Sequence, residues 1–415
     1  MPPTDLAIGD VRSLIVDGAA HRGFCVARTD GRVVFVRGAI PGEQVQVQIT
    51  RRGSKGRFWF GDVVRVEVPS PDRVAHPWPA SAPVGGLELG HVSLEGARRW
   101  KGAVIQDQLR RLGRLAWPQV DVEAAPGDAQ RGGLHWRTRV QLAVDSRGRA
   151  GMRRYRSHDV IPLQDLPIAV EAFEQLGIFA RNWPAHSKLQ IALPNASDPF
   201  IAVNGQPWPN PRGKAARKFV RERVRASVGQ SVLEHEFRVA GTGFWQVHRA
   251  APQLLAEAVL QAAALEEGQR VVDLYAGAGL FSAFLAQVVG PTGTVIAIEA
   301  DEEATRAARR NFHDYSHVEI RTADVRHAVA HGQLPTADVV VLDPPRAGAG
   351  AEVIRGMIAT KPRKIVHVSC DPATFARDVA TYYELGWEMA SLRAFDIYPL
   401  THHVETLAVF TPLVS

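Results

Sequence analysis

The sequence predicts a multidomain α/β protein in three parts: a small N-terminal β-barrel (residues 1–68), a middle α+β domain (69–240) and a C-terminal Rossmann-like, doubly wound domain (241–415). Three observations predict this fold class. The chain has 415 residues, whereas one domain usually has roughly 100–200. Short alternating strand patterns fill the first part of the chain. From about residue 243 strand and helix patterns alternate, which is typical of a mainly parallel sheet with helices on both faces.

The composition is that of a globular protein, with 46% hydrophobic and 22% charged residues. A net charge of +6 favours a polyanionic partner. Because there is neither an apolar run that could span a bilayer nor the pattern of a secretory leader, we expect a cytoplasmic protein without a membrane partner. The two cysteines, Cys25 and Cys370, cannot form a disulfide framework, so each is either packing or a reagent.

The first 68 residues predict a barrel of short strands. Val45, Val47 and Ile49 alternate with polar residues, which is the period of a half-buried strand. Asp30-Gly31 and Pro41-Gly42 supply turns. The expected strands lie at residues 12–16, 23–28, 32–37, 45–49 and 63–68.

The tip of this barrel predicts RNA binding, because it combines cations for phosphates with rings for bases. The residues are Arg51, Arg52, Lys55, Arg57, Phe58, Trp59 and Phe60. A solvated basic hairpin over core aromatics remains the alternative. The segment resembles the TRAM domain, an RNA-binding barrel found in some RNA-modifying enzymes. Cys25 lies within a predicted strand and is expected to be packing.

The middle region predicts an irregular loop (69–90), a helix (93–112) and two strands between residues 134 and 163 that flank the turn Asp145-Ser146-Arg147-Gly148. Five cations recur at three- and four-residue spacing, which predicts one basic face of a helix. They are Lys214, Arg217, Lys218, Arg221 and Arg225. Nucleic-acid binding and simple solvation both explain such a face.

Residues 271–285 predict a strand, a tight turn through Gly277 and Gly279, and a helix. Glu299 ends the next strand about 20 residues later, where it would meet a ribose diol. The dinucleotide fingerprint requires a third glycine where this chain has Ser282. The pattern D-x-Y-x-G-x-G, which begins at Asp273, instead resembles motif I of S-adenosylmethionine methyltransferases.

Cys370 is the predicted nucleophile. It lies where a strand (364–369) ends, with Asp371 placed as the N-cap and Pro372 at the first position of a helix. The helix start favours a thiolate and predicts a pKa below the free value of about 8.5. The glycine turn, Glu299, Asp343 and Cys370 all fall at the carboxyl ends of strands, where ligands bind in open α/β sheets.

A thiol beside a methyl donor suggests methylation of carbon 5 of a pyrimidine. Addition of the thiolate to carbon 6 activates carbon 5, and a base must later remove the proton from carbon 5. Glu405 is the candidate base. His402 and His403 are rival bases, and a packing or positioning role suits them equally.

The turn Asp343-Pro344-Pro345-Arg346 favours uracil as the base. Amino-methyltransferases carry an aromatic residue after the two prolines, where this chain has Arg346. Cytosine carbon-5 enzymes usually carry a cysteine after a proline here, and this turn has none. A cytosine carbon-5 RNA methyltransferase remains the alternative enzyme, and an RNA-binding or RNA-folding module is the alternative without catalysis.

Three stretches of the sequence resemble the RNA uracil-5-methyltransferase family. They are the 343–346 turn, the run Ser369-Cys370-Asp371-Pro372-Ala373-Thr374-Phe375-Ala376-Arg377-Asp378 and the ending His403-Val404-Glu405. The resemblance implies that Cys370 is the nucleophile and Glu405 the proton acceptor. It also implies S-adenosylmethionine contacts from Gln246, Tyr275, Glu299, Asp324 and Asp343. The substrate would be structured RNA, ribosomal or transfer, with the TRAM-like barrel favouring ribosomal RNA. The base would be flipped into a pocket between the middle and catalytic domains.

The chain departs from that family in two ways. Many relatives carry a four-cysteine iron–sulfur site, whereas this chain has Trp78, Val84, Leu87 and Leu166 at the matching positions. Apolar side chains cannot hold iron, so we expect no cluster and a site filled by packing. His248 stands where asparagine is frequent and Leu280 where a polar residue is frequent, which affects the expected cofactor contacts. The oligomeric state is left open.

Overall fold

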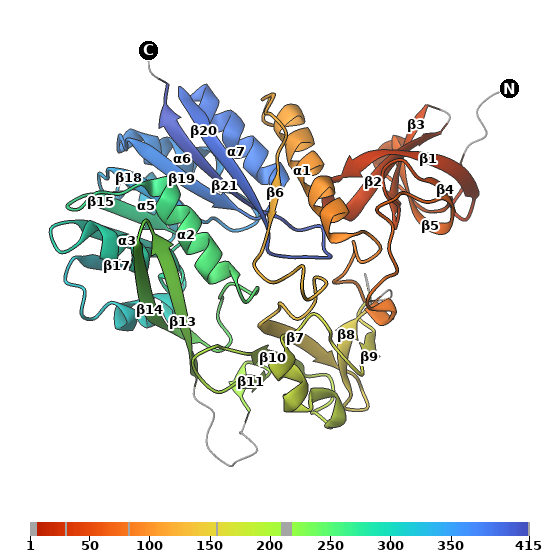
Figure 1. Cartoon of the computed structure of the whole chain (residues 1–415), viewed down its shortest axis with the longest axis horizontal. Helices are drawn as coiled ribbons and strands as arrows, with labels where there is room; N and C mark the ends of the chain where they lie inside the picture. Colours follow the sequence, from red (N-terminus) through yellow and green to blue (C-terminus); the bar gives the residue numbers. More distant parts are fainter. Residues whose placement is uncertain (1–5, 30, 82–83, 155–156, 209–217, 414–415) are drawn as a thin grey trace.

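A computed structural model of the protein describes residues 6–29, 31–81, 84–154, 157–208 and 218–413 (Figure 1). The N-terminal barrel lies on one side of the molecule and a large α/β sheet lies on the other. A smaller sheet built from the middle of the chain lies below both (Figure 1). The structure confirms the predicted multidomain α/β class.

The barrel closes through five strands of the described chain, in the order β1-β2-β3-β5-β4. They are β1 (Val11–Ala20), β2 (Phe24–Thr29), β3 (Arg32–Arg37), β4 (Gln44–Arg52) and β5 (Phe58–Val68). The alternation in β4 turns Val45, Val47 and Ile49 inward. Cys25 is fully buried, so its predicted packing role is confirmed.

Two details at the barrel tip differ from the prediction. Trp59 is only 2% exposed and belongs to the barrel core, so the expectation that its ring faces RNA is wrong. Phe58 and Phe60 alternate with it and point outward. Arg51, Arg52 and Arg57 are exposed, whereas the side chain of Lys55 lies outside what the structure describes.

The middle sheet has six strands among the described residues, in the order β12-β11-β10-β7-β8-β9. They are β7 (Arg139–Val144), β8 (Ala150–Arg153), β9 (Val160–Pro162), β10 (Lys188–Ala192), β11 (Phe200–Val203) and β12 (Gln206–Pro207). The predicted turn between β7 and β8 is confirmed. There the Asp145 carboxylate accepts the backbone N–H groups of Arg147 (2.8 Å) and Arg149 (2.9 Å).

The C-terminal sheet joins eight strands of the described chain. Their order is β17 (Val318–Thr322), β16 (Thr294–Glu299), β15 (Arg270–Leu274), β18 (Val339–Leu342), β19 (Lys364–Ser369), β21 (Glu405–Pro412), β20 (Trp387–Asp396) and β6 (Val122–Ala124). β15 to β19 run parallel, and β21 is antiparallel to both of its neighbours. The sheet therefore confirms the doubly wound prediction.

Helices cover both faces of this sheet, and each face has its own apolar core. α2 (Ala251–Ala263), α3 (Leu280–Val289) and α4 (Glu302–Asn311) pack on one face. α1 (Leu94–Arg111), α5 (Val325–Ala330), α6 (Gly350–Ala359) and α7 (Pro372–Glu384) pack on the other. No helix in the described ranges is long and apolar enough to cross a membrane.

Segments before residue 240 also build the C-terminal layers. β6 pairs with β20, and α1 packs against α7 (Figure 1). A hairpin of β13 (Phe219–Val228) and β14 (Ser231–Ala240) packs on α2 and α4. The division of the chain at residues 68 and 240 stays a prediction.

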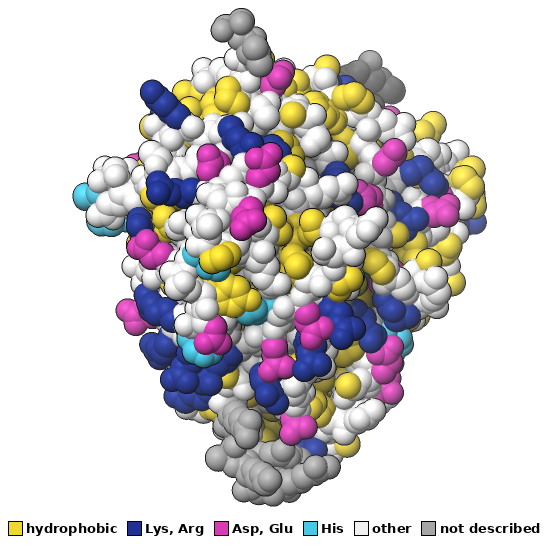
Figure 2. Space-filling model, turned by 60° about the vertical axis from the view of Figure 1, so that its left-hand side comes forward, with side chains coloured by type: hydrophobic (Ala, Val, Ile, Leu, Met, Phe, Trp, Pro, Cys, Tyr) yellow, Lys and Arg dark blue, Asp and Glu magenta, His cyan; other side chains and the backbone are white. Residues whose placement is uncertain are grey.

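The basic helix predicted over 214–225 is wrong where the structure describes it, because residues 219–228 form the strand β13. Lys214 and Arg217 lie outside the described residues. Arg221, Arg223 and Arg225 share the exposed face of the strand and pair with Glu234 and Glu236 across the hairpin. On the face shown in Figure 2, acidic side chains are interspersed with the basic ones. The ladder is therefore largely neutralised and makes a poor phosphate-binding surface.

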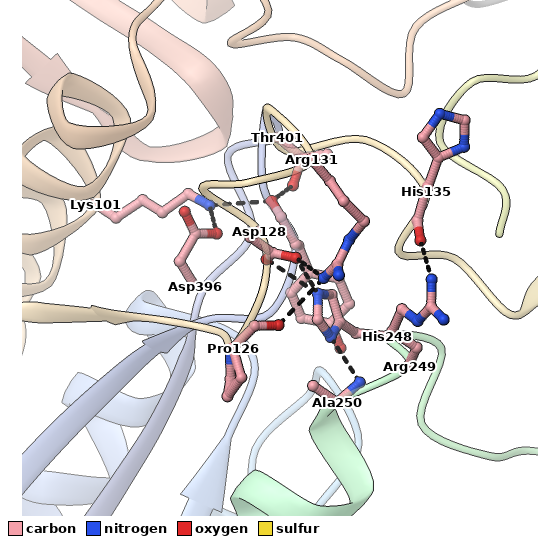
Figure 3. A network of polar contacts seen from close by, with 11 residues as sticks. Lys101, Pro126, Asp128, Arg131, His135, His248, Arg249, Ala250, Asp396 and Thr401 are labelled. Carbon is pink, nitrogen blue, oxygen red and sulfur yellow. Dashed lines mark hydrogen bonds and ion pairs between the residues drawn. The ribbon is translucent and has the colours of Figure 1, made fainter. Parts of the chain in front are cut away.

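A buried ion pair joins α1 to β20, the strand next to the edge strand β6 in the C-terminal sheet. Lys101 Nζ lies 2.5 Å from Asp396 Oδ1 (Figure 3). It also donates to the carbonyl of Tyr398 at 3.0 Å. Lys101 is 1% exposed and Asp396 is 2% exposed. Loss of one partner would leave the other charge buried without compensation.

We expect Lys101→Met to lower the free energy of unfolding by about 3–5 kcal/mol, because Asp396 would keep an unpaired buried charge. Urea denaturation followed by circular dichroism measures this. Arg110→Ala is the matched control on the same helix, since its exposed pair with Asp107 is worth less than about 1 kcal/mol. Adding Asp396→Leu to Lys101→Met should recover most of the loss. A Lys101→Met protein as stable as the control contradicts the prediction.

Candidate active site

The end of β19 places Cys370 directly before α7. Asp371 caps that helix, because its carboxylate accepts the N–H groups of Ala373 and Thr374 at 3.0 Å each. β19 pairs antiparallel with β21, and the register joins Ser369 to Thr406. One further step along that register brings Cys370 beside Glu405.

A buried and a half-buried carboxyl flank this thiol. Glu405 is 3% exposed, and within the described chain its Oε1 has no hydrogen-bond partner. Asp343 follows β18, the strand next to β19, at the same edge of the sheet. Burial and the charge of Asp343 raise the pKa of Glu405 well above its ordinary value, and burial also raises the pKa of Asp343. Two neighbouring carboxyls with raised pKa values resist joint ionisation, so the pair retains a proton near neutral pH.

The expectation that the helix start lowers the pKa of Cys370 is wrong for the free protein. Burial, with the charges of Glu405 and Asp343, raises the pKa of this thiol to about 12, while Arg346 opposes the rise. The helix dipole acts only over its first turn, and two carboxyls from neighbouring strands outweigh it. The thiol is therefore protonated at neutral pH.

The two histidines before β21 have different surroundings. His402 Nδ1 lies 3.7 Å from Glu88 Oε2. Burial raises the pKa of Glu88, but the interaction with the nearby His402 ring outweighs it and lowers that pKa to about 2. His403 Nε2 lies 3.3 Å from Arg346 Nη2. Burial and the charges of His402 and Arg346 lower the pKa of His403 to about 3, which makes this imidazole a weak proton acceptor.

Helix α7 also holds the loop that follows Asp343. Thr374 Oγ1 donates to the carbonyl of Arg346 at 3.1 Å. Asp378 accepts the backbone N–H groups of Ala349 (2.8 Å) and Gly350 (3.0 Å). The helix that begins after Cys370 and the loop that carries Arg346 are thereby tied together.

The glycine turn between β15 and α3 has the backbone that its sequence predicts. Gly277 (φ 57°) and Gly279 (φ 92°) both adopt left-handed conformations. A Cβ at Gly279 would lie 2.4 Å from the ring of Phe312, so the packing requires glycine, whereas the space beside Gly277 is open. Glu299 Oε2 accepts the Gly277 N–H at 2.9 Å, so the predicted ribose-binding carboxylate lies at this turn.

Three further predicted residues surround the turn. Asp273 is buried and accepts a 2.5 Å bond from Ser282 Oγ, but its Oδ1 has no partner in the described chain; burial raises its pKa to about 7. Burial raises the pKa of Tyr275 to about 12, with the charges of Asp324 and Glu299 adding to the rise. Asp324 caps α5 through the N–H of His327.

Three features of this turn suit a nucleoside with a polar amino-acid tail. They are the open space beside Gly277, the unpaired oxygen of Asp273 and the carboxylate of Glu299 within hydrogen-bond reach of the turn. Gln246 lies apart from this group in the sequence, buried in the connection between β14 and α2.

The two positions that depart from the family pattern are both buried. His248 Nε2 lies 3.0 Å from Asp128 Oδ2, and its Nδ1 accepts the N–H of Ala250 at 3.1 Å (Figure 3). Its ring stacks on Trp136 at 5.7 Å. His248 therefore anchors the segment that carries Gln246 to the turn at Asp128. Leu280 is 8% exposed and packs in the core under α3.

The four residues at the expected iron–sulfur positions are all buried. Trp78, Leu87 and Leu166 share the apolar core under the middle sheet, and Val84 is 8% exposed. Trp78 Nε1 donates to Asp165 at 2.8 Å. Packing therefore fills this region, as the sequence predicts. Among the residues that the structure describes, no group of three histidine, cysteine or acidic side chains is arranged to hold a metal ion.

Cys370 lines an open cavity of about 1720 Å³ between the barrel and the C-terminal domain. The barrel contributes the outward faces of β2, β3 and β5. Residues of segments 76–81 and 85–91 and the end of α1 form a second wall, and Arg346, Cys370 and His403 form the third. The predicted middle domain supplies this second wall and the barrel supplies much of the rest, so the pocket that would receive the base stays a prediction.

The turn between β1 and β2 joins the barrel to this site. His21 Nε2 lies 3.2 Å from Asp371 Oδ2, which makes His21 a partner of the residue that caps α7. A Cβ on the neighbouring Gly23 would lie 3.3 Å from His402 Cβ. The barrel therefore contacts both segments that hold the candidate catalytic residues.

Sequence reasoning missed Tyr398 as a neighbour of the site. Its hydroxyl hydrogen-bonds to Glu405 and favours the ionised carboxylate, which lowers the pKa of Glu405 against the larger effect of burial. Its ring packs against Trp136 at 6.3 Å and against His403 at 5.8 Å. The nearby motif marked this segment, but no local signal placed the tyrosine against the carboxyl.

Comparison with family models divides the chain into three matches. Residues 6–68 match the TRAM domain. Residues 240–337 match the protein-L-isoaspartate(D-aspartate) O-methyltransferase model, and residues 333–411 match the tRNA (uracil-5-)-methyltransferase model.

Relatives match over nearly the whole chain. An uncharacterized RNA methyltransferase of Streptomyces coelicolor is 36% identical over 98% of this chain and 93% of its own length. One of Bifidobacterium longum is 37% identical over 95% of each chain. The crystal structure of Pyrococcus abyssi tRNA (uracil-54, C5)-methyltransferase in complex with S-adenosyl-L-homocysteine has the same fold. It is 21% identical with a TM-score of 0.70, and the match covers 96% of this chain and 100% of that one.

We expect Cys370 to react slowly with iodoacetamide at neutral pH, with a rate that still rises above about pH 9, because burial and the carboxyls raise the pKa of its thiol to about 12. Glu405→Gln removes one of those carboxyls, so the pKa should fall and alkylation at about pH 9 should accelerate. Mass spectrometry of the modified peptides follows the rate at each cysteine.

Cys25 serves as the internal control in the same chain, because it is fully buried and should stay unmodified while the fold persists. A rate at Cys370 that levels off near neutral pH, or one that Glu405→Gln leaves unchanged, contradicts the prediction.

Proposed function

Because the chain belongs to the RNA uracil-5-methyltransferase family, whose members depend on S-adenosylmethionine, we propose that it methylates carbon 5 of a uridine in RNA through a covalent bond to Cys370. The observation that carries the proposal is the pairing of a thiol and a carboxyl on adjacent antiparallel strands. Cys370 and Glu405 meet at the sheet edge where Asp343 and the glycine turn also lie.

In the first step the sulfur of Cys370 bonds to carbon 6 of the uracil. The electron pair of the carbon 5–carbon 6 double bond moves toward oxygen 4, and carbon 5 becomes nucleophilic. The thiol must first release its proton to the water of the open cavity, because its pKa is high in the free protein. Arg346 supplies the cation that opposes this high pKa.

S-adenosylmethionine, when bound, supplies the electrophilic methyl group that carbon 5 takes up. Glu405 then removes the remaining proton from carbon 5, the double bond re-forms, and the bond between carbon 6 and Cys370 breaks. Burial and Asp343 raise the pKa of Glu405, so it is a stronger base than an ordinary carboxylate. The pKa of His403, lowered to about 3, favours Glu405 over this rival.

The residues proposed to hold the cofactor have complementary chemistry. Glu299 offers its carboxylate to a ribose diol, and Gly277 and Gly279 let the backbone approach closely. The other residues proposed to contact the cofactor are Tyr275, Asp324, Asp343 and Gln246. Asp273 keeps an unpaired oxygen beneath the turn.

For the RNA itself we propose a uridine in ribosomal RNA, which the TRAM-like barrel favours. The Pyrococcus abyssi enzyme, by its title a tRNA methyltransferase, shares the fold over its whole length, so the fold alone does not separate the two targets. Mapping 5-methyluridine in ribosomal and transfer RNA from cells that lack the gene tests the assignment. Loss of 5-methyluridine at one ribosomal position supports the assignment. Loss at a transfer RNA position, or no loss at any position, overturns it.

We expect Cys370→Ala to abolish 5-methyluridine formation and Glu405→Gln to accumulate a protein–RNA adduct, because proton removal slows by roughly 10²–10⁴-fold while addition proceeds. Denaturing gels detect the adduct, and nucleoside mass spectrometry identifies the product. Glu388→Gln, at a half-buried position near the start of β20, is the matched control and should behave as the unmodified chain. If 5-methylcytidine forms instead, or if Cys370→Ala retains activity, the proposal is wrong.

RNA that contains 5-fluorouridine should form a denaturation-resistant adduct with the protein in the presence of the cofactor. Fluorine cannot leave carbon 5 as a proton does, so the bond to Cys370 persists after methylation. Cys370→Ala should form no adduct with the same RNA. If an active preparation forms no adduct, methylation without a covalent intermediate is indicated.

A further inference from the structure

The turn between β1 and β2 has an unusual backbone. It consists of His21, Arg22 and Gly23, and we call it the docking turn. Both Arg22 (φ 64°) and Gly23 (φ 75°) are left-handed. A left-handed arginine is strained, and such strain persists only where the surrounding structure holds it. The contacts of the docking turn must therefore keep it in this conformation.

The docking turn contacts the C-terminal domain at two places. His21 Nε2 lies 3.2 Å from Asp371 Oδ2, and the two side chains are 24% and 23% exposed. A Cβ at Gly23 would lie 3.3 Å from His402 Cβ, so the turn packs closely on the segment that precedes β21. Because Asp371 directly follows Cys370, the first of these contacts lies one residue from the candidate nucleophile.

The two carboxylate oxygens of Asp371 have different partners. Oδ1 accepts the N–H groups of Ala373 and Thr374 and so caps α7, whereas Oδ2 faces His21. Burial raises the pKa of Asp371, but the nearby His21 ring and the cap lower it below its ordinary value. Within the described residues, the other side-chain hydrogen bonds of Asp371 are made inside α7. His21 therefore links this carboxylate to a different domain.

The barrel does not need His21 in order to stay docked. Helix α1 lies between the barrel and α7 and packs against both (Figure 1). Apolar side chains of α1 and of the segment before it share one core with the barrel interior; they are Leu89, Val92, Ala97, Trp100 and Val104. Burial of such a core stabilises the docked barrel far more than one half-exposed polar contact does. The contact between His21 and Asp371 therefore has a role other than attachment of the barrel.

The position of the Cys370 thiol depends on the two elements that flank it. β19 holds the residue before it through the sheet, and the start of α7 holds the residue after it. Asp371 has partners at both carboxylate oxygens, so its side chain cannot rotate freely, and the start of α7 keeps one orientation relative to the barrel. Bond formation requires reacting atoms about 3–3.5 Å apart and correctly oriented, so a small displacement of the sulfur slows it strongly.

We propose that His21 is a positioning residue for the reaction. Its contact with Asp371 fixes the start of α7 and thereby the direction from which the thiol of Cys370 meets the RNA base. The inference rests on the proposed function, and it adds that the barrel contributes a side chain to the active site. Loss of this contact should slow the reaction of bound RNA without weakening the binding of RNA or cofactor.

Steady-state methylation by the full chain tests the inference. The substrate is total RNA from cells that lack the gene, which contains the unmethylated target whichever RNA carries it. We expect His21→Leu to lower kcat about tenfold and to change KM for RNA and for S-adenosylmethionine less than about twofold. His21→Gln keeps an N–H group at similar reach and should recover most of kcat. His313→Leu removes an exposed histidine beside Asp314, outside the cavity, and should behave as the unmodified chain.

Two further measurements ask whether His21 acts through Asp371. Asp371→Asn still caps α7, because asparagine caps as well as aspartate, but it removes the charge that faces His21. Adding Asp371→Asn to His21→Leu should lower kcat no further, because the contact is already lost. Hydrogen exchange, which needs no substrate, should be at least about threefold faster at Ala373 and Thr374 in His21→Leu and unchanged in the barrel strands.

The inference is overturned if His21→Leu raises KM for RNA and leaves kcat unchanged, because His21 would then bind RNA instead of positioning the thiol. It is also overturned if His21→Gln is as slow as His21→Leu, if the losses from His21→Leu and Asp371→Asn multiply, or if exchange at the start of α7 is unchanged. Small-angle scattering that shows an undocked barrel in His21→Leu would assign the contact to attachment and overturn it too. Absence of 5-methyluridine from the unmodified enzyme would refute the proposed function, whereas hydrogen exchange reports on the contact alone.

Discussion

The register between β19 and β21 is the constraint on which the candidate site depends. Because the two strands run antiparallel and Ser369 pairs with Thr406, the first residue after one strand meets the first residue of the other. A thiol and a carboxyl separated by 34 intervening residues of sequence (371 to 404) become neighbours without a loop to hold them. A shift of one residue would turn Glu405 to the opposite face of the sheet, since side chains alternate along a strand.

The same edge gathers three acidic groups that are partly shielded from water. Asp343 arrives from β18, Glu405 from β21 and Cys370 from β19. Burial raises the pKa of each, Asp343 adds to the rise at Glu405, and both carboxyls add to it at Cys370. Such a group of acids stores protons at neutral pH, which suits a site that must first release a proton from sulfur and then collect one from carbon. Arg346 and the hydroxyl of Tyr398 are the neighbours that favour the ionised forms.

Much of this arrangement could be predicted from local sequence. Asp371 and Pro372 mark the start of α7, alternation in β4 marks the barrel, and the glycines mark the turn after β15. The sequence of β13 predicts a helix wrongly because Arg221 and Arg225 fit both a helical and an alternating pattern, and the buried Glu222 interrupts the apolar half of the alternation. β6 has three residues and exists only because β20 offers an edge, so it leaves no signal of its own. The pKa of Cys370 depends on carboxyls from two other strands, which a helix-start argument cannot include.

The bonds from Thr374 and Asp378 to the loop after Asp343 have a consequence for how a substrate is received. The loop and the helix are fixed to each other during folding, so the conformational entropy of arranging Arg346 against Cys370 is lost before any encounter. An incoming nucleotide would meet a rigid template on this side. Any change of shape on binding would then occur in the nucleic acid, or in the position of the barrel, which contacts this site through His21.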